Sequence, residues 1–513
     1  MTTETSQPKA AATAAHTAAP PVDPSPLMEM LRVAAPTVAM MASYTMMTFT
    51  DKFLVARLGP EPVYVGAQGN GGLISWVPIS IVHGMLTIIN TYVSQNLGAG
   101  KPERGPAYAW NGLWVACIYW LLVLVPYGFA LPWILRMAQV PPGQIEMAAD
   151  YGRILVFGSI LTMTTRSLGQ FFFGMQQARV VMVAGIVANI FNVFAAAVFA
   201  YGNGAIADFS GSWLGAIMQP VVGAAHHVAV WLHIPRMGVA GSAWGTLLAT
   251  VVEMAIPTAV FLGPKFNAKY KTRSAWRWST GHVKDLVRLG WPGGAMFGNE
   301  MICWGYFMVH LVSKFGEEHS TAGWIAHQYM SLSFMPAVGI SVACTAVVGK
   351  YMGMGKPDLA AQRAWLGVRV AIVYMISCGI LMVLFRHQLI AFFIDAKTPP
   401  ESVSRVIALG SMFLVATAAF QAFDAIAMTL SGALRGAGDT LIPGLATLVL
   451  SWLVIVGAGT VLVAVLPERI KPMGGWIGAA SYIILLATML LLRFVGGKWK
   501  TNKVLKESSV AGH

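Results

Sequence analysis

The sequence predicts an all-α integral membrane protein built from two similar halves, and three observations support this. First, the 513 residues are 56% hydrophobic and only 11% charged, whereas charged residues make up roughly 25% of a soluble domain. Second, uncharged apolar runs of about 20 residues, enough to cross a bilayer as a helix, recur along the whole chain. Third, a motif of the first half returns in the second. The runs are long and continuous, which favours helices over the short alternating strands of a barrel.

The apolar runs, bounded by Gly, Pro and charged residues, predict a fold of about twelve transmembrane helices. They cover 28–55, 61–95, 106–134, 148–173, 179–202, 238–264, 285–312, 320–348, 362–388, 401–434, 439–466 and 473–496. The expected organisation is a disordered cytoplasmic tail (1–27), an N-terminal lobe (28–264) with an outer insertion (203–236), a basic cytoplasmic linker (265–284), a C-terminal lobe (285–496) and a basic cytoplasmic tail (497–513).

The net charge of +13 indicates orientation and not nucleic-acid binding. If the N-terminus is inside, the inner connections are richer in Lys and Arg than the outer ones, so the positive-inside rule places both termini in the cytoplasm. The uncharged run from Ser212 to Pro235 is long enough to cross, but a crossing would move the basic linker outside. We therefore expect this run to be re-entrant or interfacial on the outer face.

An internal repeat indicates that the two halves share one fold. Asn96–Glu103 (NLGAGKPE) returns as Tyr351–Asp358 (YMGMGKPD), and upstream Arg32 and Pro36 match Arg288 and Pro292. Six spans per half is an even number, so the two bundles enter the membrane in the same direction and are related by a pseudo-two-fold axis along the membrane normal. Two facing bundles create a central cleft that rocking can expose to either side, which favours a secondary transporter. The alternative is a duplication that only stabilises the bundle.

Carboxylates within the expected spans are candidate functional groups, because an acid at the membrane centre costs roughly 2.5 to 3.5 kcal/mol. They are Asp51, Glu253, Glu300 and Asp424. From the helical rise, Glu300 lies roughly 24 Å from the inner end of its span and Asp424 roughly 16 Å from the inner end of its own. Both depths are near mid-membrane, where a coupling-ion or substrate site belongs.

Such acids suit an exchange mechanism. Burial favours the neutral form of a carboxyl group, so it can carry a proton near neutral pH, and its anionic form can bind Na+ or a cationic drug. Na+ would be bound at Glu300 and Asp424. In each case the alternative is a structural pair, which for Asp51 would be a local ion pair with Lys52. Glu253 has no repeat mate and is the weaker candidate.

Other chemistry is not expected. His83, His310 and His327 are isolated within spans and fit hydrogen-bonded packing better than metal binding, and the four cysteines lack pairing or metal-type spacing. The glycines at Gly98 and Gly100 precede Lys-Pro and do not open a helix after a strand, so they do not indicate a nucleotide loop. We therefore expect no enzyme activity, no ATP-driven transport and no cofactor apart from Na+ or H+ as coupling ion.

The chain also resembles the multidrug and toxic compound extrusion (MATE) family, in its bacterial NorM-like branch. The resemblance covers roughly residues 28–500 and rests on three segments, which are Asp51–Gly59 after Pro36, Val93–Glu103 and Gly432–Thr440. It implies that Glu300 and Asp424 are cation-coupling acids of the C-terminal lobe, and that Asp51 and Asn192 belong to an N-terminal site.

The sequence departs from the family pattern at Ala56, where the family has Gly, and at Ala196, which is often acidic. These departures weaken the N-terminal site and favour the C-terminal pair. The insertion 203–236 and Glu253 lie outside the pattern.

The leading hypothesis is an antiporter of the cytoplasmic (inner) membrane that exports amphipathic, often cationic, small molecules in exchange for Na+ or H+. We expect it to work as a monomer in the lipid bilayer, with a small-molecule substrate and no nucleic-acid partner. One alternative is a flippase for a lipid or lipid-linked saccharide, which predicts a cationic cleft, whereas the visible mid-membrane charge is acidic. An intramembrane enzyme is a further alternative, and the sequence shows no nucleophile and base set for it.

Overall fold

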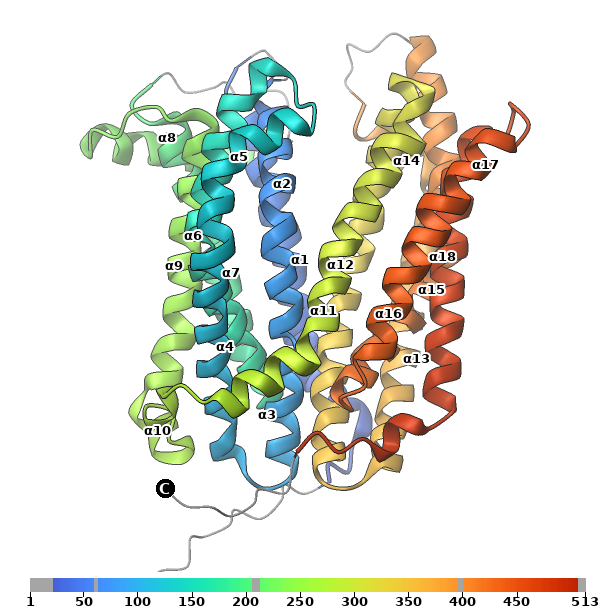
Figure 1. The fold of residues 1–513 in the computed structure, drawn as a ribbon. Helices are drawn as coiled ribbons and strands as arrows, with labels where there is room; N and C mark the ends of the chain where they lie inside the picture. Colours follow the sequence, from blue (N-terminus) through green and yellow to red (C-terminus); the bar gives the residue numbers. More distant parts are fainter. Residues whose placement is uncertain (1–21, 60–62, 205–212, 395–399, 506–513) are drawn as a thin grey trace, which may run out of the picture.

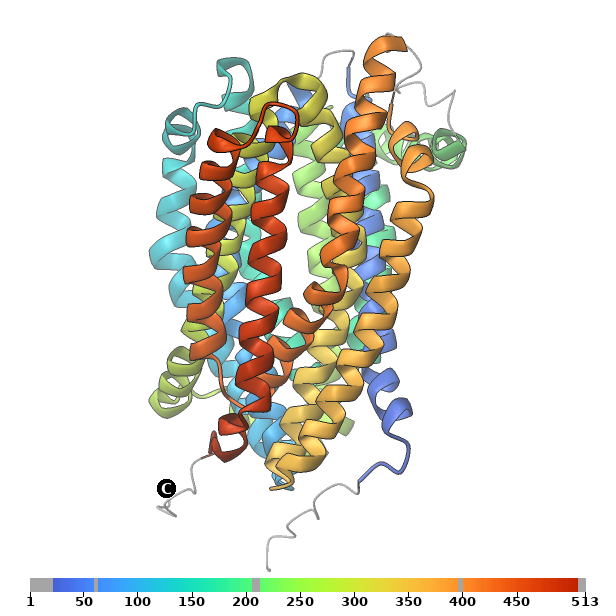
Figure 2. The same cartoon turned by 90° about the vertical axis from the view of Figure 1, so that its right-hand side faces the viewer.

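The computed structural model describes residues 22–59, 63–204, 213–394 and 400–505, and within these ranges all regular structure is helical. Most helices run along one common axis, so the molecule is an elongated bundle (Figures 1 and 2). The described part of the chain begins and ends at the same end of this bundle (Figures 1 and 2). We call this end proximal and the opposite end distal.

The first half, the N lobe, contains helices α1 to α9. They are α1 (Pro26–Ala56), α2 (Val63–Leu86), α3 (Ile88–Gly98), α4 (Gly105–Tyr119), α5 (Val125–Met137), α6 (Pro142–Gly174), α7 (Ala178–Tyr201), α8 (Trp213–Trp231) and α9 (Gly238–Leu262). Helices α2 and α3 follow one another almost without a break, and a π-helical turn, Trp120–Leu124, joins α4 to α5. A short helix, α10 (Pro264–Tyr270), begins the linker to the second half.

The second half, the C lobe, contains helices α11 to α18. They are α11 (Thr280–Tyr306), α12 (Glu317–Gly353), α13 (Pro357–Leu384), α14 (Arg386–Ala391), α15 (Pro400–Gly436), α16 (Leu441–Leu450), α17 (Gly459–Val465) and α18 (Gly474–Val495). A π-helical segment, Ser451–Ala458, makes α16 and α17 one continuous rod. The helices begin and end within about two helical turns of the ranges expected from the apolar runs.

In the described part of the chain, nine helical stretches are long and apolar enough to cross a membrane. Helices α1, α6 and α11 are not among these nine stretches, but they are 31, 33 and 27 residues long and pack against them. All three carry charged side chains. The structure is therefore an all-helical bundle of the expected class, and the count of twelve spans stays a prediction.

The lobes meet along helices that the repeat relates to each other. Helix α1 packs on α12, and α2 and α3 pack on α11 and α12. Exchanging the halves maps α1 onto α11 and the α2–α3 rod onto α12, so the two contacts are equivalent, as a pseudo-two-fold axis between them requires. The ribbons of the two lobes are closest near the proximal end and diverge toward the distal end (Figure 1).

Glycines permit this close approach at the proximal end. A Cβ atom on Gly98 of α3 would lie 1.9 Å from the carbonyl oxygen of Lys350, and one on Gly353 of α12 would lie 2.0 Å from that of Gln95. Gly98 and Gly353 are repeat mates in the GAGKP and GMGKP motifs. Neither position can hold a side chain while the lobes are in contact here.

Helix α8 lies across the distal end of the N lobe and does not cross the bundle (Figure 1). Its buried residues Met218, Val222, Ala225 and Ala229 form one cluster with the distal ends of α1, α7 and α9. Trp231 is 77% exposed at its end. An apolar helix of this kind across the bundle end agrees with the interfacial segment expected from Ser212–Pro235, of which Ser212 itself lies outside the described residues.

Candidate functional site

Glu300 and Asp424 come together in the interior of the C lobe. Glu300 lies on α11 and Asp424 on α15, and the two carboxyl groups are close enough to interact electrostatically. The Tyr482 hydroxyl on α18 donates a hydrogen bond of 3.5 Å to Oε1 of Glu300 and lies within electrostatic range of Asp424. Both acids are partly accessible. Three helices therefore supply two acids and a hydroxyl to one region of the C-lobe interior.

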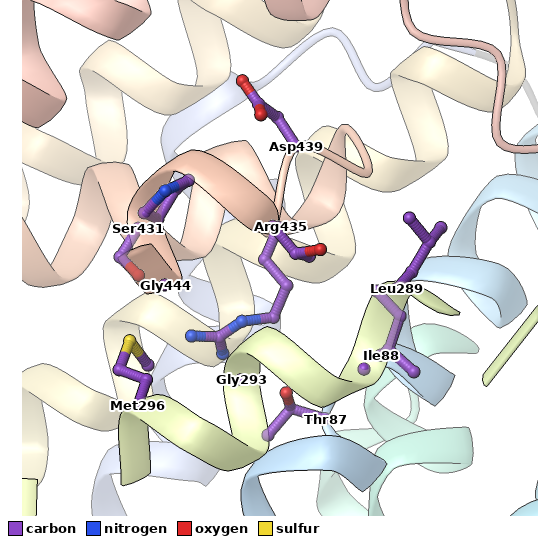
Figure 3. A pocket seen from close by; sticks show the side chains of 12 residues that line it. Thr87, Ile88, Leu289, Gly293, Met296, Ser431, Arg435, Asp439 and Gly444 are labelled. Atoms are coloured by element: carbon purple, nitrogen blue, oxygen red, sulfur yellow. The ribbon is translucent and has the colours of Figure 1, made fainter. Parts of the chain in front are cut away.

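Arg435 also points into this region. The sequence analysis did not single it out. In Figure 3 its side chain reaches from the end of α15 toward Gly293 and Met296, whereas Asp439 points away. Asp439 instead pairs with Arg493 at 2.7 Å. Arg435 interacts electrostatically with Glu300, so the proximal side of the carboxylate pair carries a cation.

The pocket beside Arg435 lies at the seam between the lobes. Thr87 and Ile88 of the N lobe line it, together with α11, α15 and α16 of the C lobe. Its free volume is about 10 Å³, which is room for about one water molecule. This pocket is too small for an organic substrate.

Asp51 lies in a separate cluster near the distal half of the N lobe. Its side chain accepts hydrogen bonds of 2.8 Å from Gln68 on α2 and 2.8 Å from Ser242 on α9. Lys52 is exposed, and among the described residues no ion pair joins it to Asp51. The local pair considered from the sequence is therefore replaced by contacts that only the fold creates.

Asn192 on α7 joins the Asp51 cluster through α9. Its Nδ2 donates to the Thr246 hydroxyl at 3.2 Å, one turn along α9 from Ser242. Its Oδ1 is buried, with no hydrogen-bond partner in the part of the chain that the structure describes. The two N-lobe residues singled out by the family resemblance are thus near one another, linked through two hydroxyl residues.

Glu253, the weaker candidate, has an electrostatic partner that the sequence analysis missed. Arg166 on α6 interacts with Glu253 on α9, and Arg166 also lies within range of Arg435 across the lobe boundary. The view of the mid-membrane charge as purely acidic was therefore wrong, because Arg166 lies inside the apolar run 148–173. The interior carries charges of both signs.

A buried ion cluster seals the proximal end between the lobes. Glu29, in the first turn of α1, is 3% exposed and lies 2.8 Å from Lys350 Nζ and 3.0 Å from Arg363 Nε, both in the C lobe. The Tyr351 hydroxyl donates a third bond of 2.8 Å to Glu29, and Arg363 also donates to the carbonyl oxygen of Asp23 at 3.1 Å. We call Glu29, Lys350, Tyr351 and Arg363 the proximal latch.

The repeat supplies a counterpart of this latch. Glu29 stands three residues before Arg32, and Asp285 stands three before Arg288, in the two segments already matched. Asp285 begins the C lobe and contacts the N lobe, where Tyr108 donates its hydroxyl to the Asp285 side chain and Tyr92 donates to the Asp285 carbonyl oxygen at 3.3 Å. Each lobe thus places an acid against the other lobe. Extending the sequence repeat by three residues upstream would have revealed this pair of acids.

A side chain at Gly98 should prevent the proximal seal from forming. We expect Gly98→Ala to cost the closed proximal state about 1 to 3 kcal/mol, as overpacking in a tight contact does. Alkylation by an impermeant maleimide of a cysteine placed at Ser94, a buried residue of the seam, would measure this. The matched control is Gly305→Ala in α11, where a Cβ meets nothing within 4 Å. Equal alkylation rates in both variants would contradict the prediction.

With this geometry in place, comparison with known proteins identifies the family. The MatE family model matches residues 36–198 and 297–459, once in each lobe. The chain belongs to the MATE family. It is therefore a multi-pass membrane transporter of that family, and the resemblance noted in its motifs is confirmed.

Its relatives are proteins named NorM. The chain is 28% identical over 475 residues to a probable multidrug resistance protein NorM of Mesorhizobium japonicum, covering 91% of this chain and 92% of that one. It is 27% identical to the protein of the same name from Thermotoga maritima, covering 82% of each chain. A multidrug resistance protein NorM of Burkholderia vietnamiensis is 25% identical, with 93% and 95% covered.

Solved structures confirm the MATE fold. An outward-facing multidrug resistance MATE transporter of the MOP superfamily has a TM-score of 0.78 at 19% identity, covering 92% of this chain and 97% of that one. A MOP superfamily transporter from Pyrococcus furiosus, described as having a binding pocket of reverse polarity, also has a TM-score of 0.78 at 19% identity, with 92% and 95% covered. At such identity the likeness concerns the fold alone.

Proposed function

We propose that this chain is a secondary antiporter that exports amphipathic, often cationic, small molecules in exchange for Na+ or H+. The observation that carries the proposal is the placement of Glu300 and Asp424 in one region of the C-lobe interior, close enough to interact electrostatically. Two adjacent carboxylates repel when both are ionised, so they favour binding one cation between them. A coupling ion and a cationic substrate then compete for the same charge, which is the basis of exchange.

The choice of coupling ion follows from the ligands present. Glu300, Asp424 and the Tyr482 hydroxyl offer hard oxygen donors of the kind that Na+ binds, and a carboxyl group in the interior can also carry a proton. In the described residues no group of three or more His, Cys, Asp or Glu could hold a metal ion. Na+ would therefore need hydroxyl, carbonyl or water oxygens in addition to the two acids.

We place the proximal end in the cytoplasm of the inner membrane. The basic linker and the basic C-terminal tail lie at that end, as the positive-inside rule requires. With the proximal end sealed by the latch, the described conformation is the outward-facing one, and the substrate leaves through the distal end. The transporter works as a monomer in this account, since each chain supplies both lobes, and it has no enzymatic step.

A flippase for lipids or lipid-linked saccharides is the second candidate, and the structure offers it one observation. Arg166 and Arg435 bring positive charge into the interior, as a site for a phosphate-bearing headgroup would need. Glu253, Glu300 and Asp424 lie in the same region, and their charge keeps the cation antiporter as the better-supported function.

Flux of a cationic dye from proteoliposomes tests the proposal. We expect the purified chain to accelerate the movement of a rhodamine ethyl ester when either a Na+ gradient or a pH gradient is imposed. The gradient that drives flux identifies the coupling ion. Flux equal to that of protein-free vesicles under both gradients would contradict antiport, and flux of fluorescent lipid without any gradient would favour the flippase.

A further inference from the structure

A groove opens on the surface of the C lobe near its distal end, between α17 and the rod that continues α11. Both elements run toward the distal end (Figure 1). The free volume of the groove is about 360 Å³, within the range of about 300 to 1,000 Å³ that is usual for small-ligand sites. None of the residues that line it belongs to the pair of acids in the C lobe or to the proximal latch.

Two π-helical segments interrupt the helices on either side of this groove. Phe307–Val312 continues α11, and Ser451–Ala458 joins α16 to α17. A π-helical turn holds an extra residue, and such turns are frequent at functional sites. Gly459 brings α17 so close that a Cβ atom there would lie 2.9 Å from Cδ1 of Leu311. Leu311 and Val463 line the groove and are buried, so its inner side is apolar and closed.

Two basic side chains on the rim of the groove have donors to offer. Lys314 and His310 line the groove and are exposed, and in the described part of the chain neither side chain makes an ion pair or a hydrogen bond. The ring of Tyr306 lies 4.8 Å from the His310 ring, centroid to centroid. The hydroxyls of Tyr306 and Thr460 form a hydrogen bond of 3.0 Å with each other. Lys314 and His310 therefore remain to bind a ligand.

The acids near this end of the C lobe are already close to other cations. Glu318 lies 3.5 Å from Arg405, and Glu468 lies 2.6 Å from Lys471. Lys314 is thus left as a cation without a counter-ion among the described residues. An ammonium group binds a phosphate as a point charge, so the rim of the groove is complementary to an anionic phosphate group.

Apolar surface continues from the groove along the helices that form it. Val309 lies on the rim and is exposed, and so are Val461 and Val465 of α17. In a membrane protein such side chains meet acyl chains, and a lysine near a helix end reaches the headgroups. A ligand with a phosphate at one end and acyl chains at the other would use both parts of this surface, whereas a free phosphate would use only the charged part.

We propose that the groove between α11 and α17 binds the headgroup phosphate of an anionic phospholipid from the leaflet at the distal end. Lys314 is its counter-ion, His310 donates a further hydrogen bond, and the acyl chains lie along Val461 and Val465. The inference requires only that the chain spans a membrane, so it does not depend on the proposed antiport. The lipid would contact α11, the helix that also carries Glu300.

Native mass spectrometry of the purified full chain tests this assignment. The probes are dioleoyl phosphatidylglycerol and dioleoyl phosphatidylcholine, which share their acyl chains and a phosphate and differ in net charge. We expect the wild type to bind phosphatidylglycerol more tightly. Lys314→Gln should weaken this binding about fivefold, since a basic residue at a lipid surface contributes about 1 kcal/mol. Thr460→Trp keeps every charge but fills the groove, and it should weaken the binding as well.

A matched variant separates the groove from the general surface charge. Lys471→Gln removes the same charge at the same end of the C lobe, from a cation that Glu468 already pairs with, and it should leave the affinity for phosphatidylglycerol unchanged. The assignment is overturned if the wild type binds both lipids equally, if Lys314→Gln and Lys471→Gln weaken the binding equally, or if Thr460→Trp binds like the wild type. Displacement of the lipid by inorganic phosphate alone would also overturn it, because the groove would then be a site for a free anion.

Discussion

Replacing Glu300 by Gln, or Asp424 by Asn, is expected to abolish ion-driven transport. Each substitution removes one of the two interacting carboxyl groups, and with it the charge that the coupling ion and a cationic substrate would share. The loss of one charge-assisted contact reduces affinity about tenfold or more. Since exchange needs competition at the same position, the gradient-driven flux of the rhodamine ester should fall to the level of protein-free vesicles.

Controls separate this effect from misfolding. Both substitutions keep the shape of the side chain, so the thermal unfolding midpoint in detergent should stay close to that of the wild type. Asp150→Asn removes a carboxylate of α6 that is 54% exposed in its side chain and paired with Arg153, and it should transport normally. Full ion-driven flux in both Glu300→Gln and Asp424→Asn would leave the C-lobe acids without a role.

The second large effect is expected at the proximal latch. Glu29→Gln leaves the buried side chains of Lys350 and Arg363 without their counter-ion, and breaking a buried ion pair by removing one partner costs about 3 to 5 kcal/mol. Because the cluster joins the two lobes, its loss should destabilise the closed proximal state more than it destabilises the fold of either lobe. The population should therefore shift strongly toward a state that is open at the proximal end.

Alkylation at the seam measures this shift. A cysteine at Ser94, in a background without the four native cysteines, should react with an impermeant maleimide much faster in Glu29→Gln than in the parent. Glu146→Gln, an exposed acid in the first turns of α6, should not change the rate. A variant that remains folded and keeps the slow parental rate would show that the latch does not hold the lobes together.

Much of the fold could be predicted, because an apolar run long enough to cross a lipid bilayer predicts a helix. The ends of α7 and α9 fall within two residues of the runs 179–202 and 238–264. The helical rise alone predicts the depth of Glu300 and Asp424, and this depth stays a prediction. The fold class followed from the composition, the apolar runs and the repeat, whereas the interfacial position of α8 stays a prediction.

The missed residues depend on tertiary contacts. Arg435 ends a helix, where a cation normally meets solvent, but its side chain lines the pocket at the seam between the lobes. Glu29 lies near the start of the first span, where an acid ordinarily meets water, but the C lobe buries it to 3% exposure. Asp51 had Lys52 as its obvious partner in sequence, whereas the fold supplies Gln68 and Ser242 from helices that no local pattern relates to it.

The central claim is that two lobes expose one interior site to the two sides in turn, and paired distances between spin labels test it most directly. One pair of labels, at Glu103 and Lys356, spans the proximal seam. The other pair, at Ala138 and Arg469, spans the distal end. All four positions are exposed. Adding the coupling ion or the cationic rhodamine ester should lengthen one distance and shorten the other. Two distances that stay constant, or that change in the same direction, would contradict alternating access.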